Sequence, residues 1–171
     1  MLKMLSKIST KIKTRQKAKD VFITPVELAK KLIKRHKNTD DDNIWLDPFK
    51  NNGSFYNNFP DKNPKDWCEI LLGMDFFTYD MPVDIISSNP PYSILDKVFD
   101  KTFEICKKEF GYLLGIHNLT ARRIQMANKK GFFIKSIYMT KVFKWFGMSI
   151  YVIFSKEIDD NLIDFDRTVW R

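Results

Sequence analysis

The stretch Ser88-Asn89-Pro90-Pro91-Tyr92-Ser93 holds the residues of this sequence best suited to chemistry. An apolar run, residues 83–86, leads directly into it and is typical of a strand. Two consecutive prolines cannot donate to a sheet ladder or continue a helix, so the backbone must leave the sheet there. The Asn89 amide and a neighbouring proline carbonyl could then hold an amino group. The alternative is a plain strand-terminating turn, since asparagine and proline are common in turns.

The elements that must position this stretch alternate between strand and helix. We expect helices at 25–37, 94–108 and 121–130, and strands at 43–47, 66–70, 83–88, 111–117, 132–140 and 149–155. Thr24 is expected to cap the first helix, with Pro25 at its first position. The alternation predicts an α/β fold with a doubly wound, mostly parallel sheet that ends in an antiparallel strand. In such a sheet a ligand site lies where strand ends meet.

Composition favours one folded domain. The chain has 171 residues, of which 44% are hydrophobic and 15% aromatic, and this argues against disorder. No apolar run approaches the ~20 residues that cross a membrane. Cys68 and Cys106 are isolated, which predicts no metal site and no disulfide framework, and so a reducing, intracellular and by default cytoplasmic location. A net charge of +8 fits a polyanionic partner such as nucleic acid, although it also fits a merely soluble protein.

Asn89 to Tyr92 after a hydrophobic strand resembles the Asn-Pro-Pro-Tyr motif of S-adenosylmethionine-dependent amino-methyltransferases, chiefly the DNA adenine-N6 enzymes. The resemblance implies a Rossmann-like class I methyltransferase fold, reduced in size because residues 53–67 are few for a complete helix and crossing. It also implies that the Asn89 oxygen and the Pro90 carbonyl accept the two N6 hydrogens, which turns the lone pair toward the sulfonium methyl. Pro91 belongs to the same motif, and Tyr92 would stack on the target base, extruded if the substrate is a duplex.

The loop after the first expected strand resembles the family's first cofactor motif. On that resemblance Asp47, Pro48 and Gly53 lie at the methionine part of the cofactor, where the backbone approaches closely. Asn51 stands where the family usually has its first glycine. Asparagine tolerates positive φ better than most residues, so the turn can survive with less room above the cofactor.

Five further residues complete the expected cofactor site. Glu69, at the end of the strand expected at 66–70, suits a ribose diol, and the alternative is a solvated edge-strand glutamate. Asp75 and Phe76 match the family's third motif, which contacts the cofactor adenine, although Phe76 could simply be core. Phe22 and Thr24 resemble the segment that flanks the methionine end, or else a plain helix entry. We expect no metal.

We divide the chain into a basic N-terminal segment (1–19), a methyltransferase domain (20–156) and a polar tail (157–171). The N-terminal segment holds seven Lys or Arg and no acid. It could bind phosphates, pack on the domain or act as a targeting peptide. Lys144 to Gly147 could offer aromatic rings to an extruded base or could cap the core.

Methylation of adenine N6 in DNA is therefore the leading hypothesis. An RNA adenine methyltransferase, a protein glutamine methyltransferase and a non-catalytic methyltransferase-like subunit of a nucleic-acid-binding complex are the alternatives. The resemblance covers residues 20–155 and leaves no room for a separate target-recognition domain. Specificity is expected to come from loops, the tail or a protein partner.

Overall fold

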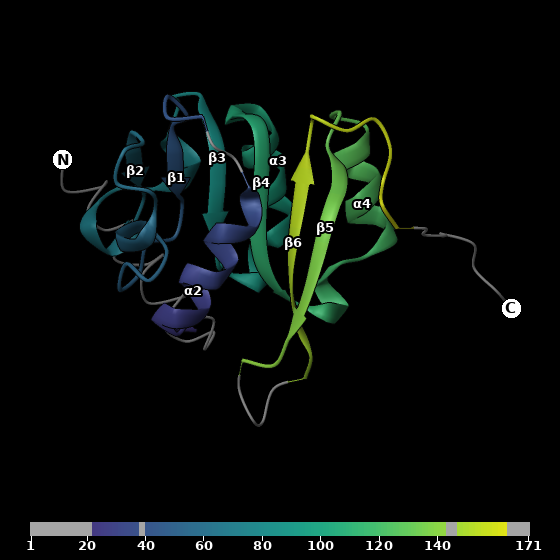
Figure 1. Ribbon diagram of the computed structural model, residues 1–171, viewed down its shortest axis with the longest axis horizontal. Helices are drawn as coiled ribbons and strands as arrows, with labels where there is room; N and C mark the ends of the chain where they lie inside the picture. The colour runs from purple at the N-terminus through teal and green to yellow at the C-terminus, as the bar shows by residue number, and fades with distance from the viewer. Residues whose placement is uncertain (1–21, 38–39, 143–146, 164–171) are drawn as a thin grey trace, which may run out of the picture.

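The computed structural model describes residues 22–37, 40–142 and 147–163 of the chain (Figure 1). The basic N-terminal segment, Trp145 and Phe146, and most of the polar tail lie outside the described residues.

A six-stranded sheet forms the centre of the protein, with strand order β2-β1-β3-β4-β6-β5. The strands are β1 (Trp45–Asp47), β2 (Lys65–Trp67), β3 (Val83–Ser88), β4 (Cys106–Gly115), β5 (Phe133–Thr140) and β6 (Ser149–Ser155). Strand β6 runs antiparallel to both of its neighbours, and the pairs among β1 to β4 are parallel. This confirms the predicted α/β fold with a mostly parallel sheet and an antiparallel C-terminal strand.

Helices cover both faces of this sheet, as Figure 1 shows with α2 in front and α3 and α4 behind. Helix α2 (Val26–Ile33) packs with Tyr151 and Ile153 of β6, whereas α3 (Leu95–Ile105) and α4 (Ala121–Asn128) pack with Ile150, Val152 and Phe154. The β6 residues divide in this way because a strand has a two-residue period, which sends alternate side chains to opposite faces of the sheet. All of β6 is buried because both faces are covered.

Several element boundaries differ from the sequence prediction, among them the end of the first helix, which is Ile33 instead of residue 37. Two of the differences concern the sheet. The helix expected at 94–108 ends at Ile105, and β4 begins at Cys106 instead of residue 111, because Val83 of β3 pairs with Cys106 and Ile85 with Glu109. The strand expected at 66–70 is β2, which ends at Trp67, so Glu69 lies beyond it. Tertiary pairing, which local propensity does not encode, sets both limits.

Short 3₁₀ turns replace full helices in the first half of the sheet. They are η2 (Tyr56–Asn58), η3 (Ile70–Leu72) and η4 (Phe76–Thr78). The fold is therefore a reduced one, as its short 53–67 segment predicted. Within the described ranges, none of the helices has the length and apolar character that a membrane span requires.

A buried polar network lies between α2 and the sheet. His36, which ends the 3₁₀ turn η1 (Lys34–His36), contacts Glu109 Oε1 through Nδ1 at 2.6 Å and the Tyr151 hydroxyl through Nε2 at 2.7 Å. The Tyr151 hydroxyl also lies 2.6 Å from Ser87 Oγ. Burial acts to raise the pKa of Glu109, but His36 and Lys135 outweigh it and hold that pKa below its ordinary value. Sequence analysis missed this network because its members are far apart in the chain.

Gly111 makes room for the centre of this network. A Cβ at this position would lie 2.8 Å from His36 Nε2 and would overlap the Tyr151 hydroxyl. Both groups are buried and hydrogen-bonded, so neither can move away without leaving a polar atom unpaired.

We therefore expect Gly111→Ala to lower the free energy of unfolding by about 1–3 kcal/mol, as overpacking of a tight core does. Chemical denaturation measures this change. Gly147→Ala is the matched control, because a Cβ there meets nothing within 4 Å. Equal stability of the two variants would contradict the role given to Gly111.

Candidate active site

The expected site residues gather at the point where the strand order reverses. From β1 the chain crosses to β2 on one side, and β3 and β4 lie on the other. Asp47 ends β1 and Ser88 ends the neighbouring parallel strand β3, so their side chains meet at the carboxyl edge of the sheet. Ligands of open α/β sheets bind in the crevice at such a switch point.

Asp47 ties the two strand ends to the following loop. Its Oδ1 accepts hydrogen bonds from Ser88 Oγ (2.6 Å) and the Phe49 amide (3.2 Å), and its Oδ2 accepts one from the Tyr56 amide (3.2 Å). Burial raises the pKa of Asp47 from 3.8 to about 6, although these three donors favour the charged form. Asp47 is only 1% exposed, so the main role of its carboxylate is to hold the conformation of the loop after β1.

The loop after β1 contains two residues with positive φ. Gly53 has φ 84° and its amide donates to the Lys50 carbonyl at 2.7 Å, while Asn51 has φ 47°. Asn51 therefore adopts the positive φ that the sequence analysis expected an asparagine to tolerate at this position. A Cβ on Gly53 would lie 2.6 Å from Nδ2 of the exposed Asn57 side chain, which can move away, so the positive φ is what requires glycine here.

Glu69 closes the loop from the β2 side. Its Oε2 accepts a hydrogen bond from the Asn51 amide at 2.9 Å and its Oε1 one from the Leu71 amide at 3.1 Å. The side chain is buried, with 8% of the residue exposed, which excludes the solvated edge-strand alternative. Each carboxylate oxygen keeps further lone pairs that can accept from hydroxyl groups.

The Asn89 amide is fixed by the segment before α2. Its Nδ2 donates to the Phe22 carbonyl at 3.0 Å and to Thr24 Oγ1 at 3.3 Å. A backbone carbonyl can only accept, so the amide cannot be turned around, and Oδ1 must point the other way. This Oδ1 is buried and has no hydrogen-bond partner among the described residues. Buried polar atoms are nearly always paired, so this one indicates a place for a donor that the described residues do not supply.

A pocket opens beside this amide. Its lining is mainly apolar and comes from both sides of the sheet edge: Phe22, Ile23, Asn89, Tyr92, Leu113, Val142 and Ser149. The Tyr92 ring lies 6.4 Å from the Phe22 ring, and its hydroxyl donates to the Leu113 carbonyl at 3.4 Å. Ile23, Leu113, Val142 and Ser149 were not predicted, because only the fold brings them next to the motif.

Thr24 does not cap the first helix as predicted. The N-terminal cap residue of α2 is Pro25, and no side chain caps that helix. The Thr24 hydroxyl instead accepts from Asn89, and the Thr24 carbonyl accepts from Ser54 Oγ at 2.7 Å. Thr24, which is buried, therefore joins the glycine loop to the Asn89 motif.

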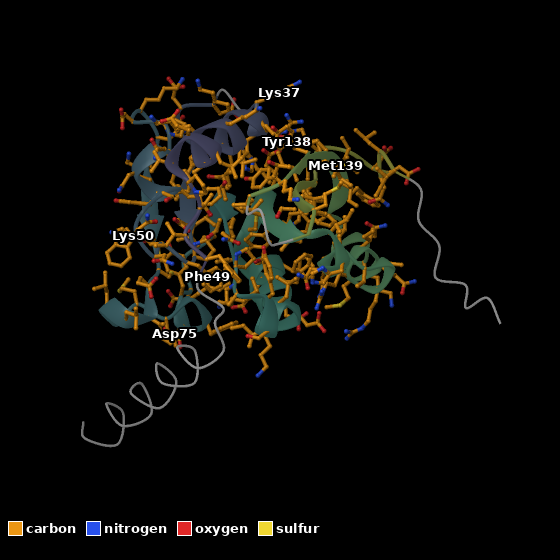
Figure 2. All side chains as sticks on the ribbon, turned by 90° about the horizontal axis from the view of Figure 1, so that it is seen from below. Lys37, Phe49, Lys50, Asp75, Tyr138 and Met139 are labelled. Carbon is orange, nitrogen blue, oxygen red and sulfur yellow. The ribbon has the colours of Figure 1, made fainter. Side chains whose placement is uncertain are left out.

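The other predicted residues lie around the same edge. Pro48, Pro90 and Pro91 are buried. Asp75 is the N-terminal cap residue of η4, and its Oδ1 accepts a hydrogen bond from the Phe77 amide at 3.1 Å. Phe76 is buried, and the centre of its ring lies 5.3 Å from that of Phe49. Phe76 is thus a core residue, whereas Phe49 and Phe77, whose rings contact it, are partly exposed. In Figure 2, Phe49 lies centrally and Asp75 on the side away from α2.

No family model matches this sequence, and a search of the curated proteins finds no match either. Within the described residues, no cluster of three potential metal ligands occurs.

Solved structures share the fold. A proposed RNA methyltransferase from Pyrococcus horikoshii has a TM-score of 0.64 and 18% identity, over 79% of this chain and 87% of that one. Magnesium protoporphyrin IX methyltransferase from Synechocystis, solved with bound S-adenosylmethionine, has a TM-score of 0.60 and 9% identity, over 87% and 83%. Precorrin-6y C5,15-methyltransferase from Geobacter metallireducens has a TM-score of 0.55 and 13% identity, over 78% and 90%.

The chain therefore has the class I methyltransferase fold, as the sequence motifs predicted. The three similar proteins carry names that refer to RNA, to precorrin-6y and to magnesium protoporphyrin IX, so this fold does not select a substrate.

The buried Asp47 carboxyl gives a testable pH dependence. Its pKa in the folded state, about 6, lies above the ordinary 3.8, so its protonation favours folding at low pH. That contribution is complete below pH 3.8 and is lost as pH rises through about 6, for a total of up to about 3 kcal/mol.

We expect the difference in unfolding free energy between the wild type and Asp47→Asn to fall over this pH range. Asparagine cannot ionise, and its amide can still meet Ser88 Oγ. Glu109 is present in both proteins, so its opposite titration at lower pH cancels. Denaturant titrations from pH 4 to pH 7 measure the difference, and a constant value would contradict the raised pKa.

Proposed function

We propose that this protein transfers a methyl group from S-adenosylmethionine to the N6 amine of adenine in DNA. The observation that carries the proposal is the buried, unpartnered Asn89 Oδ1 at the apolar pocket. Because the amide is fixed, its oxygen and not its NH2 group faces the pocket, and this oxygen can only accept a hydrogen bond. An exocyclic amine supplies the N–H donor that the oxygen lacks.

The residues at the strand ends fit the cofactor. Glu69 is a buried carboxylate, suited to ribose hydroxyls, and it lies directly under the turn that contains Asn51 and Gly53. When bound, S-adenosylmethionine supplies an electrophilic methyl group on a sulfonium. Phe22 and Thr24 hold Asn89 next to this loop, because Thr24 also bonds Ser54.

Asn89 would act by orientation. The lone pair of the adenine N6 amine is delocalised into the ring, so the amine is a poor nucleophile. It becomes a better one when hydrogen bonds to its two hydrogens turn the lone pair out of conjugation with the ring. Asn89 Oδ1, with the Pro90 carbonyl as the proposed second acceptor, fixes both hydrogens and directs the lone pair. The cofactor would supply the methyl carbon, its sulfur would keep the electron pair of the S–C bond, and one amine proton would leave to solvent.

The polymer that carries the adenine is assigned from charge and motif. The net charge of +8 favours a polyanion over a protein side chain. RNA is the second candidate, because the similar Pyrococcus horikoshii structure is named as a proposed RNA methyltransferase. The non-catalytic alternative was supported by Asn51, which stands where a glycine is usual. Asn51 nevertheless forms the turn, with φ 47°, and this weakens that alternative.

Asn89→Ala is expected to lower kcat by about 10²–10³-fold, as loss of one preorganised polar group at a reacting centre does. The assay incubates the protein with methyl-labelled S-adenosylmethionine and separate DNA, RNA and protein pools. We expect label on adenine N6 in DNA with the wild type. Cofactor affinity by calorimetry and the thermal unfolding midpoint of the variant check that its pocket is intact.

Each outcome of this assay is informative. Label that persists with Asn89→Ala would contradict the role of Asn89. Label in RNA alone would move the proposal to the second candidate. If the wild type neither transfers label nor binds the cofactor, the non-catalytic alternative replaces the proposal.

Thr24→Val tests the positioning of the amide. Valine keeps the shape of threonine but loses the hydroxyl that accepts from Asn89 Nδ2. We expect kcat to fall roughly 3- to 10-fold, the cost of one hydrogen bond, with a smaller change in KM for the nucleic acid. Thr24→Ser should restore kcat, and an equal loss in both variants would refute this role.

A further inference from the structure

The outer surface of α2 and η1 is strongly basic. Residues 26–37 contain Lys30, Lys31, Lys34, Arg35 and Lys37, and Glu27 is their only acid. The buried positions Ala29, Leu32, Ile33 and His36 face the sheet, so the lysines lie on the opposite, exposed side. Within the described part of the chain, Glu27 pairs with Lys30 at 2.8 Å, and no acid pairs with the other four cations.

The opposite face of the sheet has a different charge pattern. Helix α3 carries three acids and two lysines. Its Asp96 binds both Arg122 and Arg123 of α4, each at 2.7 Å. Cations on that face are therefore partly neutralised, and the excess positive charge of the described helices is concentrated on α2 and η1.

Helix stability does not explain this concentration. Lys30 and Lys34, and Lys31 and Arg35, are spaced four residues apart, where like charges destabilise a helix by about 0.2–0.5 kcal/mol per pair. Cations near the C-terminal end gain a comparable amount from the helix dipole. These effects roughly cancel. Among the described residues, the buried Nε of Arg35 also has no hydrogen-bond partner, which folding alone does not favour.

Tyr138 of β5 connects this surface to the pocket. Lys31 Nζ lies 5.0 Å and Arg35 Cζ 4.6 Å from the centre of the Tyr138 ring. Three residues further on, Lys141 is exposed, and the next residue, Val142, lines the pocket beside Asn89. Figure 2 shows Lys37 and Tyr138 on the α2 side of the molecule, away from Asp75.

We propose that the basic face, defined as Lys31, Lys34, Arg35 and Lys37 with Lys141, binds the phosphate backbone of the nucleic acid whose base enters the Asn89 pocket. This inference rests on the proposed function. The helix rise places residues 31–37 over ~9 Å. Each strand of a duplex carries one phosphate per about 3.4 Å of helix axis, so this segment is long enough to meet more than one phosphate of a strand.

The test compares two triple variants by fluorescence anisotropy. Lys31→Gln/Lys34→Gln/Lys37→Gln removes charge from the basic face. The matched control, Lys97→Gln/Lys129→Gln/Lys130→Gln, removes the same charge from exposed lysines on the α3 and α4 side. The probes are a fluorescein-labelled single-stranded DNA 20-mer and the RNA of the same sequence, each titrated from 50 to 200 mM NaCl.

We expect the basic-face variant to bind about a hundredfold more weakly at low salt, and its log–log salt slope to fall in magnitude by about 2. The control should stay within about threefold of the wild type. Equal losses in both variants, or none in either, would overturn the proposal. The DNA and RNA arms show which polymer the face prefers.

Failure of this proposal is distinguishable from failure of the proposed function. If the wild type binds the probes through the basic face but transfers no methyl group, the surface stands and the activity does not. If the wild type binds neither probe, the surface proposal is overturned. Cofactor binding by calorimetry, which the basic-face variant should retain, still tests the methyltransferase site.

Discussion

The orientation of one side-chain amide is the constraint on which the candidate site depends. Asn89 Nδ2 is held by the Phe22 carbonyl, an atom that can only accept, and by the Thr24 hydroxyl. The amide oxygen is left buried and without a hydrogen-bond partner in the described part of the chain, at a free-energy cost of about 1–3 kcal/mol. A protein can tolerate that free-energy cost at a site where a bound ligand donates the missing hydrogen bond. The unpaired oxygen of the free protein is thereby connected to the proposed recognition of an amine.

The surrounding structure serves to keep this amide in place. Asp47 bonds Ser88, the residue before Asn89, and also two amides of the loop that follows β1. Glu69 fixes the same loop from β2, and Ser54 connects the loop to Thr24. The loop after β1, Phe22 and Thr24 before α2, and the Asn89 motif are therefore one hydrogen-bonded unit, in which a shift of any part would move the Asn89 oxygen.

The two faces of the sheet have separate roles in this arrangement. The α2 face holds the buried network of His36, Glu109 and Tyr151, which joins the end of the helix segment to the centre of the sheet. The outside of the same segment carries the unpaired cations. This network thus fixes a charged surface next to the pocket, whereas the α3 and α4 face is an aromatic-rich core on whose surface Asp96 pairs with Arg122 and Arg123.

The sequence by itself determined the class of fold, the order of the strands along the chain and the Asn89 motif, because these depend on local periodicity and on the special backbone of proline and glycine. It also predicted that Asn51 could adopt positive φ. Only the tertiary structure decided the role of Thr24, since a helix cap and a partner of Asn89 look identical in sequence. The same holds for the His36 network and for the pocket wall at Leu113 and Val142. Their contacts join residues many positions apart, and chain topology alone brings them together.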